Sequence, residues 1–173
     1  YQDKTMTKQE RLKLMSEVPF FQDLDDLKRD QLADSEDYFQ SFKEGEYIIC
    51  QGETETPIYI LLKGKAIVTR NQNPNSELAK LKYGSVFGSV SLAESALRQT
   101  NVVAQNEVLV FRIEEDLIES FDEKTNKIFN RLRRQVLVER LERLTLIIAD
   151  LKSEIELLTT EDGDETTEFD WDF

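Results

Sequence analysis

Residues 42–68 read FKEGEYIICQGETETPIYILLKGKAIV and decide the type of fold. The apolar residues of this stretch form short runs at 48–49, 58–62 and 66–68. Glycine or proline separates the runs, at Gly45, Gly52, Pro57 and Gly64. Short runs rich in β-branched and aromatic residues, bounded by turn residues, are typical of strands. The stretch therefore predicts successive short β-strands joined by tight turns.

The same pattern continues on the C-terminal side, with further strands expected at 101–104 and 108–113. Many short strands at regular spacing indicate a jelly-roll-like β-barrel. Residues 7–17 and 20–35 instead have helical spacing, and Pro19 is expected to end the first helix. We therefore expect an α+β, mainly β fold, in which a jelly-roll-like barrel is flanked by short N-terminal helices and a long C-terminal dimerisation helix. The helices and barrel are expected to occupy residues 1–123.

Residues 124–159 predict the long helix. Its apolar residues alternate steps of four and three, at Leu137, Leu141, Leu144, Ile148, Leu151, Ile155 and Leu158. This heptad repeat places Leu141, Ile148 and Ile155 at the first seam position and leucines at the second, namely Leu137, Leu144, Leu151 and Leu158. Isoleucine at the first position with leucine at the second favours a parallel two-stranded coiled coil and hence a homodimer. The alternative is a helix that packs along its own domain, where the apolar spacing is similar.

The charge is unevenly distributed along the chain. Acidic residues number 35 against 22 basic ones, and the formal net charge is −13. Residues 160–173 read TEDGDETTEFDWDF and predict a disordered acidic tail. Residues 124–143 have the opposite bias, which indicates either a solvated helix face or a site for an anion or for the tail. So acidic a chain is a poor candidate for binding nucleic acid, which requires many phosphate contacts.

The residue types present exclude several classes of enzyme. The chain has no histidine, which removes Ser-His-Asp and Cys-His nucleophile systems and most zinc or iron sites. Cys50 is the sole cysteine, so no internal disulfide is expected, and a reducing, cytoplasmic location fits. We expect a protein that is not an enzyme and has no metal or cofactor. Neither a membrane span nor a secretion signal is expected.

An ordered set of motifs resembles the cyclic-nucleotide-binding domain family, which includes catabolite-activator-like proteins and kinase regulatory subunits. The motifs are VPFFQDL at 18–24, FKEGEYIICQGE at 42–53, YILLKGKA at 59–66, and Gly84, Phe87 and Gly88 followed by Arg98. The resemblance covers about residues 12–140. Only the acidic tail follows the long helix, without space or charge for a DNA-binding domain, so we expect none.

The resemblance implies a ligand site on the segment FGSVSLAESALRQT, residues 87–100. Gly88 matches the family's leading glycine and Arg98 its phosphate-binding arginine. Arg134, in the long helix, would reach toward the base of the nucleotide. Ser89 departs from the family, which has a glutamate there for the ribose hydroxyl. The implied ligand-binding residues are Gly88, Ser89, Val90, Ser91, Arg98, Gln99, Thr100 and Arg134.

Two functions follow as hypotheses. The first is a regulatory sensor that binds a cyclic nucleotide and signals through its dimer helices to a partner protein. The expected ligand is cAMP, and the sequence leaves the choice between cAMP and cGMP open. The alternative is a degenerate domain of the same fold that acts as a dimeric interaction scaffold without nucleotide. In that case the aromatic residues of the tail, Phe169, Trp171 and Phe173, would form a docking peptide.

Overall fold

The computed structural model describes residues 6–54, 57–88 and 99–161. The chain comprises two compact units, Tyr1–Arg133 and Arg134–Phe173. The acidic tail beyond Glu161, with the three aromatic residues of the proposed docking peptide, lies outside the described residues.

The first unit begins with short, locally capped helices. Helix α1 (Lys8–Met15) has a capping box, in which Thr7 Oγ1 accepts from Glu10 N and Glu10 Oε2 accepts from Thr7 N. Helix α3 (Asp26–Asp34) is capped by Asp25, and the 3₁₀ turn η1 (Glu36–Tyr38) follows it. Pro19 opens helix α2 (Pro19–Gln22), because the missing N–H of proline is harmless at the first helical position.

The strands form two four-stranded antiparallel sheets. The strands are β1 (Phe39–Phe42), β2 (Tyr47–Ile49), β3 (Ile58–Lys63), β4 (Ala66–Thr69), β5 (Ala79–Leu81), β6 (Val86–Gly88), β7 (Asn101–Ala104) and β8 (Val108–Ile113). The first sheet has the order β1-β8-β3-β6 and the second has the order β2-β7-β4-β5. The short runs around the glycines are therefore strands, as predicted.

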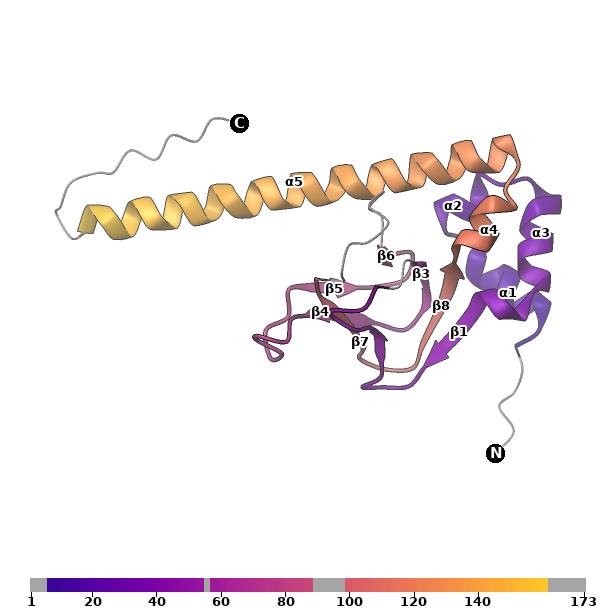
Figure 1. Ribbon diagram of the computed structural model, residues 1–173, viewed down its shortest axis with the longest axis horizontal. Coiled ribbons are helices and arrows are strands. Elements are labelled where there is room, and N and C mark those ends of the chain that lie inside the picture. The colour runs from indigo at the N-terminus through magenta and orange to yellow at the C-terminus, as the bar shows by residue number, and fades with distance from the viewer. Residues whose placement is uncertain (1–5, 55–56, 89–98, 162–173) are drawn as a thin grey trace. The chain divides into compact units, whose positions relative to one another are not determined.

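Strand β3 shows why its sequence is apolar without a break. Tyr59 and Leu61 join the core between the sheets, whereas Ile58, Ile60 and Leu62 join a second core against the helices. Successive side chains of a strand point to opposite faces, so a strand covered on both faces needs apolar residues throughout. Figure 1 shows helices α1, α3 and α4 gathered beside β1 and β8.

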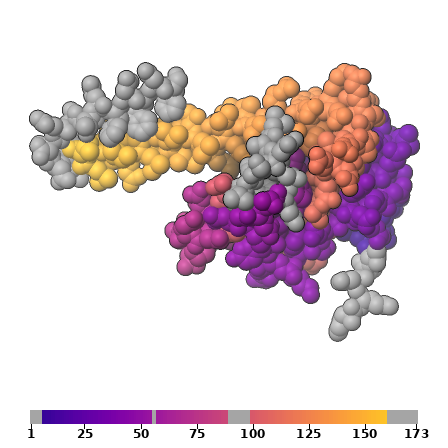
Figure 2. Space-filling model, viewed as in Figure 1, coloured from indigo at the N-terminus to yellow at the C-terminus, as the bar shows by residue number. Residues whose placement is uncertain are grey.

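Helix α4 (Glu115–Glu119) leads to the long helix α5 (Glu123–Glu161). The first turns of α5 belong to the first unit, where Phe129 packs edge-on against Phe20 and Phe121. In Figure 2 the α4 and early α5 side chains (orange) join the N-terminal helices (indigo to purple) in one packed surface. The fold confirms the prediction of a barrel with short N-terminal helices and a long C-terminal helix.

The second unit contains the rest of α5, and its apolar side chains are largely exposed. Most residues of the heptad seam are 40–64% exposed, namely Leu137, Leu141, Leu144, Leu151, Ile155 and Leu158. Within the described ranges, no helix has the length and apolar character needed to cross a membrane.

Candidate ligand site

Gly88 ends strand β6 and has a conformation that only glycine adopts readily. It pairs with Ile58 of β3, and its φ is +106°. A Cβ atom at this position would lie 2.5 Å from the carbonyl oxygen of Pro57, well inside van der Waals contact. The glycine that opens the predicted ligand segment is therefore required by the close approach of the two strands.

Phe87, the residue before it, is part of the core between the sheets. Its ring stacks on Tyr59 with the centroids 5.4 Å apart, and both residues are 3% exposed. Stacked aromatic rings of neighbouring strands contribute packing energy beyond the buried area. The Phe-Gly pair thus anchors the start of the segment to β3.

The residues predicted to contact the ligand are only partly described. Ser89, Val90, Ser91 and Arg98 lie outside the described residues. At the far end of the segment, Gln99 is exposed and Thr100 is half-buried, immediately before β7 begins. The roles assigned to these residues from the sequence stay predictions.

A buried polar network lies next to Thr100. Asn101 is 3% exposed, and its Oδ1 atom accepts a hydrogen bond from the backbone N of Gln51 at 2.7 Å. Its Nδ2 atom donates to Asn71 Oδ1 at 2.7 Å, and Asn71 N donates to Gln51 Oε1 at 2.9 Å. The network joins the turns that follow β2 and β4 to the first residue of β7. It therefore fixes the point at which the predicted ligand segment ends.

Sequence reasoning missed this network. The only signal in the sequence is an asparagine at the head of an otherwise apolar strand, together with Asn71 at the start of a turn-rich run. Either residue by itself is an ordinary turn residue. Their contact depends on the pairing of β4 with β7, which brings Thr69 opposite Asn101.

Three of the basic residues at the start of α5 have acidic partners within the first unit or on α5 itself. Arg131 lies 3.7 Å from Asp23, and Lys124 lies 3.7 Å from Asp25. Lys127 is paired with Glu123 at 2.8 Å. These pairs support the interpretation of the cluster as a solvated helix face. Arg134, the predicted base contact, is exposed and is the first residue of the second unit.

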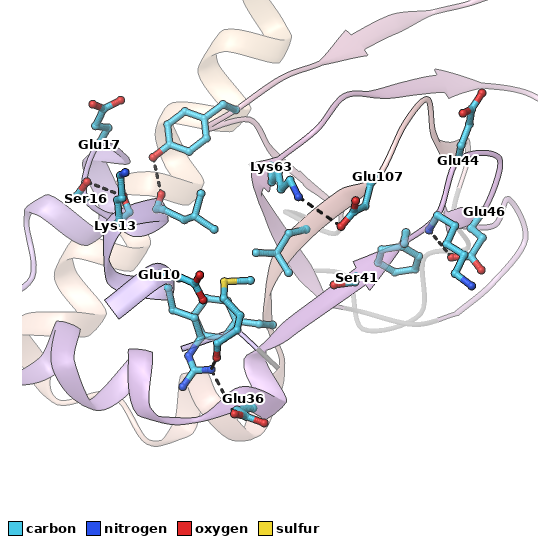
Figure 3. A pocket seen from close by; sticks show the side chains of 18 residues that line it. Glu10, Lys13, Ser16, Glu17, Glu36, Ser41, Glu44, Glu46, Lys63 and Glu107 are labelled. Atoms are coloured by element: carbon cyan, nitrogen blue, oxygen red, sulfur yellow. Dashed lines mark hydrogen bonds and ion pairs between the residues drawn. The ribbon is translucent and has the colours of Figure 1, made fainter. Parts of the chain in front are cut away.

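A groove of about 1510 Å³ opens on the first unit between α1 and β1 (Figure 3). Lys63 and Glu107 extend toward each other on its wall, with 3.4 Å between Nζ and Oε1. Tyr83 also lines the groove and donates its hydroxyl to the Leu14 carbonyl at 2.5 Å, and burial raises the pKa of Tyr83. The described ligand-site residues do not line it: these are Gly88, Gln99, Thr100 and Arg134.

No group of three or more His, Cys, Asp or Glu side chains among the described residues is arranged to hold a metal ion. The polar side chains beside the end of the segment, Asn71 and Asn101, donate and accept neutral hydrogen bonds. Such groups hold loops in place rather than transfer protons.

The comparisons with known proteins agree on one family. Residues 39–124 match the family model of the cyclic nucleotide-binding domain. The cAMP-dependent protein kinase regulatory subunit of Yarrowia lipolytica is 32% identical over 102 residues. That match covers 59% of this chain but only 27% of the regulatory subunit, so the chain spans about a quarter of its relative's length.

Solved structures share the fold. One, described as Sp-2Cl-cAMPS bound to PKAR CBD2, has a TM-score of 0.55 and 23% identity, covering 94% of this chain and 98% of its own. The regulatory subunit of a cAMP-independent protein kinase A from Trypanosoma brucei has a TM-score of 0.59 and 23% identity. It covers 78% of this chain and 48% of its own. At this identity the likeness establishes the fold alone.

Proposed function

The chain carries a cyclic nucleotide-binding domain, and from this premise we propose that it is a regulatory module, without catalytic activity, that binds a cyclic nucleotide. The proposed ligand is cAMP. The segment that Gly88 opens would hold it, and Arg98 would neutralise the charge of its phosphate. The observation that carries the proposal is the constrained geometry of Gly88, which stands at the family's leading glycine and starts the segment at one defined point.

Two further observations support this function. The Yarrowia relative, with 32% identity, is by name a regulatory subunit of a cAMP-dependent kinase. At the other end of the segment, Asn101 anchors the backbone through Gln51 and Asn71. A phosphate site needs donors that are already in position, because ordering a loop on binding opposes affinity.

The proposed output runs through the long helix to a partner protein. A ligand shifts a conformational equilibrium only by its differential affinity for the two states. The early turns of α5 pack in the same core as β8, through Phe129 and Ile128. A change in the barrel would therefore reach α5, which we propose to be the dimer helix. The isoleucine and leucine pattern of its seam, taken alone, favours parallel pairing.

A cytoplasmic location and the absence of a cofactor complete the proposal. The single cysteine, Cys50, fits a reducing compartment. The cyclic nucleotide would act as a regulatory ligand and not as a reactant, so no cofactor chemistry is required.

The second candidate function is a dimeric interaction scaffold without nucleotide. It is favoured by Ser89, which replaces the family's glutamate with a shorter, neutral side chain. Loss of a charge-assisted hydrogen bond costs about 1.5–3 kcal/mol. The Trypanosoma brucei structure, named as cAMP-independent, has the same fold. The fold therefore does not by itself select cAMP.

Isothermal titration calorimetry with cAMP and with cGMP distinguishes the two functions. The wild-type chain is compared with Arg98→Ala and with Arg143→Ala, a matched loss of one arginine from an exposed position in the second unit. The sensor function predicts saturable binding that Arg98→Ala abolishes and Arg143→Ala leaves unchanged. Absence of heat with either nucleotide at millimolar concentration would support the scaffold, because a dissociation constant of 1 mM corresponds to only about 4 kcal/mol of binding free energy.

A further inference from the structure

The exposed seam of α5 has charged residues on it and beside it. Arg134 stands seven residues before Leu141 and so occupies a seam position itself. Arg140 and Glu154 lie immediately before Leu141 and Ile155, at the position that flanks the seam on one side. Both flanking side chains are exposed. Flanking charges of a coiled coil set the orientation of the partner helix.

Parallel pairing with a second copy makes poor use of these charges. Each seam residue would then face its own copy, so that Arg134 would lie against Arg134 of the second copy. A flanking residue in the position of Arg140 would meet the residue five further along, which is Thr145, and Glu154 would meet Thr159. The parallel dimer therefore brings like charges together and forms no flanking ion pair at these positions.

Antiparallel pairing uses the same residues favourably. First-position residues then pack against second-position residues of the second copy, and one register aligns all of them. The seam layers are Leu141 with Leu151, Ile148 with Leu144, and Ile155 with Leu137. In this register Arg134 packs beside Leu158, and its guanidinium can extend to water.

The flanking residues agree with that register. Residues on the same flank of two antiparallel helices face each other, so Arg140 of one copy meets Glu154 of the other. The two-fold axis makes this contact twice, because residue i contacts residue j and j contacts i. Ile147, midway between them, meets its own copy and extends the apolar seam. The N-terminal and C-terminal ends of the two helix dipoles also lie side by side.

We propose that α5 forms an antiparallel coiled coil with α5 of a second copy of this chain, in the register that pairs Arg140 with Glu154. This inference rests on the dimerisation that forms part of the proposed function. The isoleucine and leucine pattern alone favours the parallel pair, whereas the repulsion at Arg134 opposes it, and Arg140 and Glu154 form ion pairs only in the antiparallel one.

Disulfide trapping tests the orientation in the full chain with Cys50→Ser. Leu137→Cys and Ile155→Cys are made as separate variants, one of them carrying a size tag. The proposal expects a disulfide between the two variants when they are mixed and none when either is oxidised alone. A disulfide formed by Leu137→Cys alone would overturn the antiparallel orientation and leave dimerisation intact.

Charge reversal gives an independent measurement by sedimentation equilibrium. Arg140→Glu and Glu154→Arg should each weaken the dimer on the order of tenfold, because each disrupts two ion pairs and creates two like-charge contacts. The double variant should recover the wild-type dissociation constant. A double variant as weak as the sum of the single variants would overturn the register. A wild-type chain that is monomeric at high concentration would overturn the inference together with the dimer, even if the nucleotide binds.

Discussion

Asn101 Oδ1 accepts a hydrogen bond from the backbone N of Gln51 at 2.7 Å, across 50 residues of sequence. The same side chain donates to Asn71, so one buried amide connects three parts of the barrel. This contact lies directly after the predicted ligand segment, at the first residue of β7. The network therefore holds in place the backbone at which the predicted ligand segment ends.

Asn101→Ala should destabilise the fold. The substitution leaves the Gln51 N–H and the Asn71 side chain without their partner, and a hydrogen bond lost in this way costs about 1–3 kcal/mol. Urea denaturation followed by circular dichroism measures the change. Asn75→Ala, an exposed asparagine in the β4–β5 turn, is the matched control and should be close to neutral. Equal effects of the two substitutions would contradict a structural role for the network.

Gly88→Ala should be more destabilising than Gly84→Ala. Both glycines have a positive φ, +106° and +81°, so an alanine at either position is strained by about 1–3 kcal/mol. Only at Gly88 would the added Cβ also collide with the Pro57 carbonyl, since nothing lies within 4 Å at Gly84. The difference between the two midpoints of thermal unfolding isolates the collision. A Gly88→Ala variant as stable as Gly84→Ala would show that β6 can move away from Pro57.

Asp122 should make the stability of α5 depend on pH. The Thr125 N–H donates to its carboxylate at 2.7 Å, and this bond holds the pKa of Asp122 below its usual value of 3.8. A group with a lowered folded pKa stabilises the fold above its unfolded pKa and loses that contribution as the pH falls through the folded value.

Asp122→Asn tests this dependence, because the amide keeps a capping oxygen but does not titrate. The difference in unfolding free energy between the wild type and the variant should be constant from neutral to mildly acidic pH. It should then shrink as the pH falls below 3.8, the ordinary value. Denaturant unfolding at a series of pH values provides the curve. A difference that does not change with pH would show that Asp122 acts through its hydrogen bond alone.

Ser89→Glu should tighten the binding of cAMP if the segment holds the nucleotide. Restoring the family's glutamate adds a charge-assisted hydrogen bond of about 1.5–3 kcal/mol, equivalent to roughly 10- to 100-fold in affinity. Ser95→Glu introduces the same charge elsewhere in the segment and serves as the control. Tighter binding of both variants, or of neither, would argue against a ribose contact at residue 89.

Local patterns were sufficient to predict most of the secondary structure. The apolar runs and glycines of residues 42–68 specify β2, β3 and β4, because strand alternation and turn residues act over a few neighbours. The heptad repeat predicts α5 in the same way. The family's motifs place the ligand segment, and its leading glycine, Gly88, ends β6 with a positive φ.

The contacts between distant parts of the chain were decided by tertiary structure. Asn101 and Gln51 read as ordinary polar residues until the pairing of β7 with β2 and β4 places them together. Arg11 reads as a surface residue of α1, yet it is 5% exposed and its Nε donates to the Ala33 carbonyl at 2.7 Å.

The sequence by itself determined the elements of this protein, their order and the apolar faces that must be covered, because these depend on neighbours along the chain. Tertiary structure alone decided which polar groups are buried and which partner satisfies each one. The Asn101 amide and the Arg11 guanidinium are both buried, and each needs a partner from a segment at least 22 residues away. Such partners come within reach only when the chain has folded.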